Sequence, residues 1–169
     1  MMAGNPTMLF SYLHGVFVGV HTANSPSAEE WREHCTVIER VRHETRGVLV
    51  YTQGGGPNTQ QRQQMRAALH ELPAPPTAIL TASPWVRGII TSLNWFLGNR
   101  VAAFEPHDVD GALAHITRGD APLKRDELVG VLSSLAQRLA VTLPGPISPT
   151  DGPAAAGHPK RGGIGSPGR

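Results

Sequence analysis

The stretch VLVYTQGGGPNTQQRQQM, residues 48–65, decides the fold class of this chain. It begins with a nearly continuous apolar run, which is typical of a strand buried on both faces of a parallel sheet. Three glycines follow, and then Asn58 and Gln61 stand at the spacing of a helix N-cap and its capping box. The stretch therefore predicts a buried strand at 47–52, a turn, and a helix over 58–72.

Two short strands are predicted before this stretch. The runs 8–13 and 16–22 are apolar and rich in β-formers, and they flank His14-Gly15. This pattern predicts a tight hairpin, with one long bent strand as the alternative.

A helix is predicted between this strand pair and residue 47. Ser27 and Glu30 have capping-box spacing at its start. One apolar face then follows at helical spacing. Its members are Trp31, His34, Cys35, Ile38 and Val41. On this face we expect Cys35 to be a small buried side chain and His34 a partly buried structural one.

Strands and helices continue to alternate after residue 72. Strands are predicted at 77–82 and 100–104, and helices at 84–98, 108–117 and 126–141. This order predicts an α/β domain, with a mostly parallel sheet, an N-terminal strand pair and helices packed on it. The domain is expected over 1–118, with a linker and an amphipathic helix over 119–141. Six prolines and seven glycines after residue 142 predict a disordered tail at 142–169.

Charge and composition exclude several classes of function. The net charge is +2, but residues 1–141 carry twelve basic and twelve acidic side chains, so the excess lies in the tail. We therefore expect no nucleic-acid partner. No apolar run approaches the roughly 20 residues that span a bilayer, and no leader pattern is present, so we expect no membrane partner and a cytoplasmic protein. The single cysteine excludes an intramolecular disulfide.

Four segments carry a resemblance to a known family. SPSAEEW, VLVYTQGGGPN, ILTASPWVRGIITSLNWF and RVAAFEPHDVDGALAHI together resemble the STAS-like fold of bacterial anti-sigma-factor antagonists and their SpoIIAA-like relatives, over roughly residues 8–117. The resemblance implies a single STAS-like domain that docks a partner protein and is sometimes switched by phosphorylation. The family places its switch Ser or Thr after an Asp at the start of the helix that follows the central strand. Here that place reads GPNT, so Thr59 offers the only hydroxyl and the Asp-Ser pair is missing.

The glycine loop matches neither of the common phosphate-binding motifs. A Walker loop needs Lys after its last glycine, and a dinucleotide loop needs a third glycine where Thr59 stands. A plain turn, a small anion or ligand contact, and partner docking remain as interpretations. The candidate ligand-binding residues are Gly54, Gly55, Gly56, Asn58, Thr59 and Ser83, at the ends of two predicted strands.

The sequence contains no complete catalytic or metal-binding set. There is no G-x-S-x-G elbow, no H-x-x-x-H pair and no calcium loop of the required spacing. We therefore expect no catalytic residues, no metal and no cofactor.

Two helices offer candidate surfaces for a partner. On the helix at 84–98, an apolar face that includes Trp85 is expected to be core. Arg87, Thr91 and Trp95 lie on the other faces and are partner-binding candidates. The later helix carries a narrow leucine seam, which either packs on the domain or contacts a second copy or another protein. Its members are Leu128, Leu132, Leu135 and Leu139.

The sequence thus predicts a non-catalytic regulatory or protein-interaction module of STAS-like fold. Its partner would be a protein or a second copy of the chain. The alternative is a domain, enzymatic or not, that binds a small ligand or nucleotide with the loops at the C-terminal ends of the parallel strands.

Overall fold

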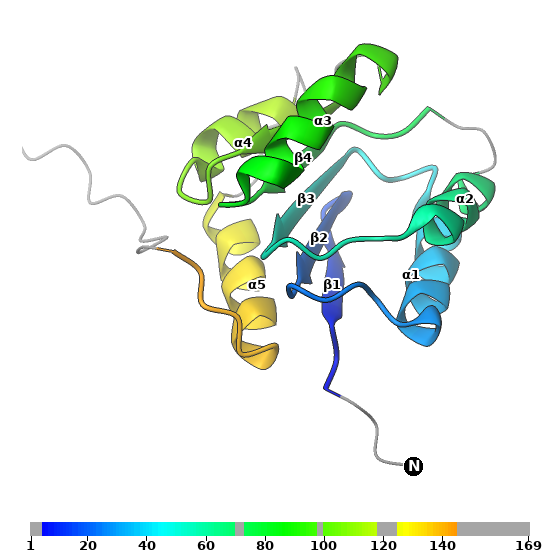
Figure 1. Cartoon of the computed structure of the whole chain (residues 1–169), viewed down its shortest axis with the longest axis horizontal. Helices are drawn as coiled ribbons and strands as arrows, with labels where there is room; N and C mark the ends of the chain where they lie inside the picture. Colours follow the sequence, from blue (N-terminus) through cyan, green and yellow to red (C-terminus); the bar gives the residue numbers. More distant parts are fainter. Residues whose placement is uncertain (1–4, 70–72, 98–99, 118–124, 145–169) are drawn as a thin grey trace, which may run out of the picture.

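The computed structural model of the chain describes residues 5–69, 73–97, 100–117 and 125–144, without the side chains of 92–97. Within these ranges the elements alternate as in Figure 1. They are β1 (Met8–Leu13), β2 (Val16–His21), α1 (Ala28–Val41), β3 (Gly47–Thr52), α2 (Thr59–Ala68), β4 (Thr77–Leu80), α3 (Pro84–Leu97), β5 (Val101–Phe104), α4 (Val109–Thr117) and α5 (Arg125–Arg138).

The strands form one sheet in the order β1-β2-β3-β4-β5, in which β1 is antiparallel to β2 and the other pairs are parallel. The predicted α/β fold class is therefore confirmed, with its mostly parallel sheet and N-terminal strand pair. Leu13 pairs with Val16, so only His14 and Gly15 form the turn. Both have positive φ angles, 51° and 81°, as a type I′ hairpin requires. The hairpin is present rather than one bent strand.

The two predicted capping boxes are both present. The Ser27 hydroxyl accepts the Glu30 amide, and the Asn58 side chain accepts the Gln61 amide, each with the reciprocal bond. Each box satisfies two amide groups that the start of a helix would otherwise leave unpaired. These local bonds explain why α1 and α2 begin where the sequence predicts.

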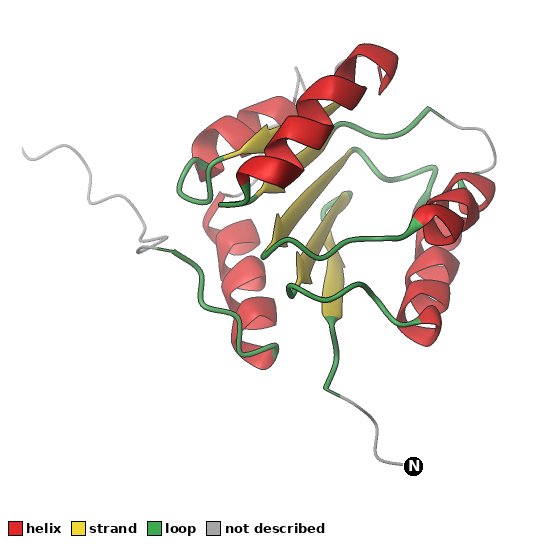
Figure 2. Ribbon diagram, viewed as in Figure 1, coloured by secondary structure: helices red, strands yellow, loops and turns green. Residues whose placement is uncertain are grey.

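One face of the sheet is closely packed. Helix α4 contacts β3, β4 and β5, and helix α5 contacts β1 and β2; Figure 2 shows the two helices on the same side of the strands. Alternate residues of β2, β3 and β4 point to this side and are buried, among them Val18, Leu49 and Leu80. Helix α5 is therefore part of the same core as the rest of the domain.

The residues just after α5 also belong to this packed unit. Val141 is buried in the core, Leu143 packs against it, and the Tyr51 hydroxyl donates to the carbonyl of Thr142 at 3.5 Å. Packing against the domain thus extends past the predicted start of the tail at residue 142. The rest of that predicted tail, 145–169, lies outside the described residues.

The opposite face of the sheet is covered by α1 and α2, which are joined to each other. The Trp31 indole N–H donates to the carbonyl of Gln61, and the Gln61 side chain donates to the carbonyl of Pro26, both at 2.8 Å. On this side the central strand is not fully buried, because Val48 and Val50 retain partial exposure while Leu49 has none. The two faces of the sheet are therefore packed to different degrees.

Candidate functional site

The carboxyl ends of three parallel strands bring buried polar side chains to one edge of the sheet. His21 ends β2, Thr52 ends β3, and Thr81 follows β4 directly. Their exposed fractions are 7%, 5% and 0%. Ligands of open α/β sheets usually bind outside this edge. It is therefore the first place to examine for a site.

The glycine loop at this edge is held by hydrogen bonds from its backbone amides. The Gly54 amide donates to the Thr52 hydroxyl at 3.0 Å, and the Gly55 amide donates to the carbonyl of Thr22 at 3.1 Å. A Cβ on Gly55 would lie 2.2 Å from the Asn24 oxygen, so only glycine fits there. Because these two amides are already bonded, they do not form a phosphate cradle. Through the bond between Gly55 and Thr22, the loop holds the end of β3 against the segment that follows β2.

The start of α2 is also satisfied internally. Asn58 and Gln61 bond each other's backbone amides at 2.8 and 2.9 Å. Arg62 donates to the hydroxyl of Thr59 at 2.9 Å and to the carbonyl of Pro57 at 2.8 Å. Thr59 is exposed, and its hydroxyl accepts a hydrogen bond from Arg62. Its role as a phosphorylation switch stays a prediction.

A surface cleft of about 310 Å³ separates the glycine loop from α3. Gly54, Gly56 and Asn58 line one wall, Arg62 lies beside them, and Trp85 lies on the α3 side. Three of the predicted ligand-binding residues therefore meet in this cleft. Ser83 instead caps α3, where its hydroxyl accepts the Val86 amide at 3.3 Å.

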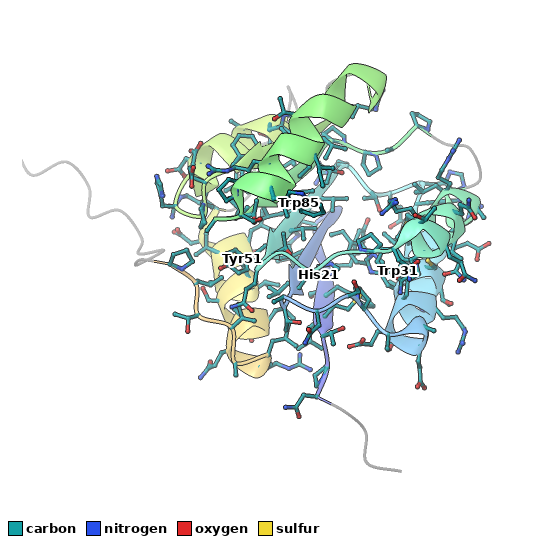
Figure 3. The ribbon with its side chains drawn as sticks, viewed as in Figure 1. His21, Trp31, Tyr51 and Trp85 are labelled. Carbon is teal, nitrogen blue, oxygen red and sulfur yellow. The ribbon has the colours of Figure 1, made fainter. Side chains whose placement is uncertain are left out.

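Trp85 corrects the sequence prediction for α3. It was expected in the core, but 72% of it is exposed, and no other large apolar side chain in the described part of the chain is exposed. Figure 3 shows it at the beginning of the helix. The physical reason is position. Trp85 lies in the first turn of α3, five residues after the end of β4 at Leu80, and it lines the surface cleft instead of the core.

The other predicted interface residues on α3 do not share one environment. Arg87 forms an ion pair with Glu105. Thr91 is exposed. The side chain of Trp95 lies outside the described residues.

The leucine seam of α5 lies in the core rather than on a free surface. Leu128, Leu132 and Leu135 are 1%, 0% and 4% exposed, and Leu139 packs against the same cluster. Of the two alternatives for this seam, packing on its own domain is the one that the structure shows.

A second hollow, of about 260 Å³, lies between the sheet and helices α1 and α2. Phe17, Gly19 and His21 of β2 face it, because alternate residues of a strand share one face. Trp31 and His34 of α1 face it from the other side. Figure 3 labels His21 and Trp31 here, away from Tyr51 on the α5 side. The prediction that His34 is partly buried is confirmed, but the sequence argument did not identify this hollow.

Burial keeps the two histidines of this hollow uncharged. It lowers the pKa of His21 to about 4, while the nearby Glu30 carboxylate partly opposes the change. Burial also lowers the pKa of His34 to about 4, and the charge of His21 adds to the effect. Both rings are therefore neutral near pH 7.

Glu30 behaves in the opposite sense. Burial by itself would raise its pKa, but hydrogen bonds from Ser27 and Thr7 outweigh burial and lower the pKa to about 2. The Thr7 amide and hydroxyl donate to its two oxygens at 2.6 and 2.8 Å. Glu30 is thus a structural anion that joins α1 to the start of β1.

The described residues contain no group of three His, Cys, Asp or Glu side chains that could hold a metal ion. None of the helices in these ranges has the length and apolarity needed to cross a membrane. No family model, curated protein or solved structure matches the chain. The STAS-like resemblance therefore stays a prediction from the sequence.

Proposed function

We propose that this protein is a non-catalytic interaction module of STAS-like fold, which docks a partner protein at the cleft between the glycine loop and α3. The observation that carries the proposal is the 72% exposure of Trp85 beside that cleft. Exposing a tryptophan in water is unfavourable by a few kcal/mol relative to burying it. Such a residue at the rim of a cleft is a natural anchor for a partner.

The neighbouring side chain supports a polar component of the same contact. Arg62 lines the cleft and its guanidinium already contacts Pro57 and Thr59. Tryptophan and arginine are the residues enriched at the energetic centres of interfaces. A partner segment with an apolar side chain flanked by a carboxylate would complement both groups.

The polar side chains of the strand ends support docking rather than catalysis. The Thr52 hydroxyl donates to the carbonyl of Gly55 at 2.6 Å, and the Thr81 hydroxyl accepts the Ser83 amide at 3.2 Å. A catalytic hydroxyl instead needs a neighbouring base. The proposal of a non-catalytic module agrees with these structural roles.

The test is a comparison of partner capture by matched variants. Tagged full-length protein is expressed at its normal level in the cells that make it, and co-purifying proteins are quantified by mass spectrometry. We expect one set of partners to be lost with Trp85→Ala and reduced with Arg62→Ala. Arg66→Ala, an exposed arginine one turn further along α2, is the matched control and should retain them.

The binding affinity of each recovered partner then tests whether it docks at this cleft. With purified proteins, Trp85→Ala should weaken binding roughly thirtyfold, since anchor residues at interfaces contribute 2 kcal/mol or more. Sedimentation of the chain alone shows whether the partner is a second copy. Equal affinities for the wild type and Trp85→Ala would refute docking at this cleft.

A further inference from the structure

The hollow between the sheet and helices α1 and α2 lies on the less closely packed face of the sheet. The opposite face of the same strands is filled, with Val18, Leu49 and Leu80 at 0% exposure. The hollow is walled mostly by apolar side chains, among them Phe17 and Trp31. The hollow has a volume of about 260 Å³ and opens in part to the surface, because Val48, Val50 and Ile79 in its walls are only partly buried.

Gly19 keeps this space open. It lies on β2 between Phe17 and His21 and faces the hollow without a side chain. A Cβ at this position would lie 3.7 Å from the nearest Val50 carbon and 3.9 Å from the Leu9 oxygen, which are ordinary contacts. The neighbouring strands therefore do not require glycine here. A larger side chain could enter the hollow and fill it.

Two histidines line the hollow, and in each of them one ring nitrogen is covered by neighbouring atoms and has no partner. His21 lines it and is 7% exposed, and its Nδ1 is buried with no hydrogen-bond partner. The Nδ1 of His34, on the facing helix, is also buried without a hydrogen-bond partner. Leaving a buried polar atom unpaired is unfavourable by about 1–3 kcal/mol. The imidazole of His21 is therefore the polar group in the wall with which a bound ligand would pair.

The size of the hollow limits the ligand. An apolar cavity of roughly 150 Å³ holds one benzene molecule. By that measure the present space takes a compact molecule of about ten non-hydrogen atoms. The aromatic rings of Phe17 and Trp31 in the walls favour a flat or ring-shaped body.

The surroundings also limit its charge. Among the residues that the structure describes, no lysine or arginine lines the hollow. The nearby Glu30 carboxylate is already bonded to Thr7 and Ser27. A charged ligand would therefore lose its hydration without gaining an opposite charge. A hydroxyl group, in contrast, both donates and accepts, so it can pair with an imidazole nitrogen in either tautomer.

We propose that this hollow is a binding site for a compact, uncharged ring compound that bears one hydroxyl group, with the hydroxyl bonded to the imidazole of His21. The site and the cleft at Trp85 are distinct hollows that adjoin at Pro57, which lines both, and this proposal does not depend on the proposed function. The occupant would insert between the sheet and the pair α1–α2.

Calorimetric titration of the full-length protein near neutral pH tests the proposal with three probes of one shape. Naphthol should bind roughly tenfold more tightly than naphthalene, because its hydroxyl pairs with the imidazole of His21. Naphthoate, with a charged group in the same place, should bind more weakly than either. Binding of naphthoate above naphthol, or of none of the three, would overturn the proposal.

Variants identify the site. His21→Leu should remove the advantage of naphthol and leave naphthalene unchanged. Gly19→Val should abolish binding of both, because its side chain fills the hollow. Trp85→Ala is the control at the other cleft and should leave both unchanged. Loss of binding in Trp85→Ala with retention in Gly19→Val would place the ligand in the surface cleft and refute the assignment.

Chemical shifts provide a measurement that does not depend on the folding of Gly19→Val. On titration of the wild type with naphthol, the ring of His21 and the methyl groups of Ile38 and Ile79, which line the hollow, should shift. Shifts confined to the indole of Trp85 and residues near it would contradict the proposal as directly as an absence of binding.

Discussion

The two buried histidines predict a specific loss of stability in mild acid. Their pKa values in the folded protein are lowered to about 4 by burial, from 6.5 in the unfolded chain. Below pH 6.5 the unfolded chain therefore binds more protons than the folded one, and the stability falls as the pH falls. This contribution to stability is complete above the pKa of the unfolded chain, 6.5, and it is lost as the pH falls toward the pKa of the folded protein, about 4.

The magnitude follows from these values. One pKa unit corresponds to about 1.4 kcal/mol, so between about pH 7.5 and about pH 5 each histidine lowers the free energy of unfolding by about 2 kcal/mol. The charges that bear on His21 are the Glu30 carboxylate and the ring of His34. Because each ring affects the other, the two contributions do not simply add. In this pH range Glu30, with a pKa of about 2, stays ionised in the folded protein.

The assay is urea unfolding at the two pH values, with the linear extrapolation applied to each curve. His21→Leu should reduce the pH-dependent loss by about 2 kcal/mol relative to the wild type. His43→Gln, a replacement of an exposed histidine, is the control and should behave as the wild type does. An equal loss in His21→Leu and in the wild type would refute the assignment of this effect to the buried ring.

Three further outcomes are expected from unfolding measurements at neutral pH. Gly55→Ala should destabilise by about 2 kcal/mol or more, because its Cβ would overlap the Asn24 backbone, whereas Gly56→Ala, with open space around it, should change the stability by less than about 0.5 kcal/mol. Leu132→Ala should lower the free energy of unfolding by about 2–5 kcal/mol, since this side chain is fully buried under the sheet, and a loss below about 1 kcal/mol would contradict its place in the core. Trp85→Ala should leave the stability within about 0.5 kcal/mol of the wild type, and a larger loss would show that the side chain is packed rather than exposed.

The sequence was sufficient wherever the deciding interactions are local. The bounds of β3 and the starts of α1 and α2 follow from an apolar run and two capping boxes, whose partners lie within three residues of each other. The hairpin at His14-Gly15 follows from a two-residue turn in the same way. The alternation of these elements then predicts an α/β sheet.

The sequence was less informative about the function of the glycine loop. Motif spacing excluded both phosphate-binding loops, but it could not separate a turn from a ligand contact. The structure shows why Gly55 is glycine: its backbone lies against Thr22 and Asn24, more than thirty residues away in the chain. A close approach of two backbones leaves no periodic signal in either segment.

Only the tertiary structure decided which helix surfaces are exposed and where hollows lie. Helical periodicity places Trp85 on the inner face of α3, yet in the fold this residue lines an open cleft and is exposed. The leucine spacing of α5 is the same whether the seam is a core or an interface, and its packing on β1 and β2 shows that it is core. The hollow at Gly19 depends on the combined volumes of side chains from several elements. Local sequence fixes the direction of a side chain, but only the assembled fold determines what lies opposite it.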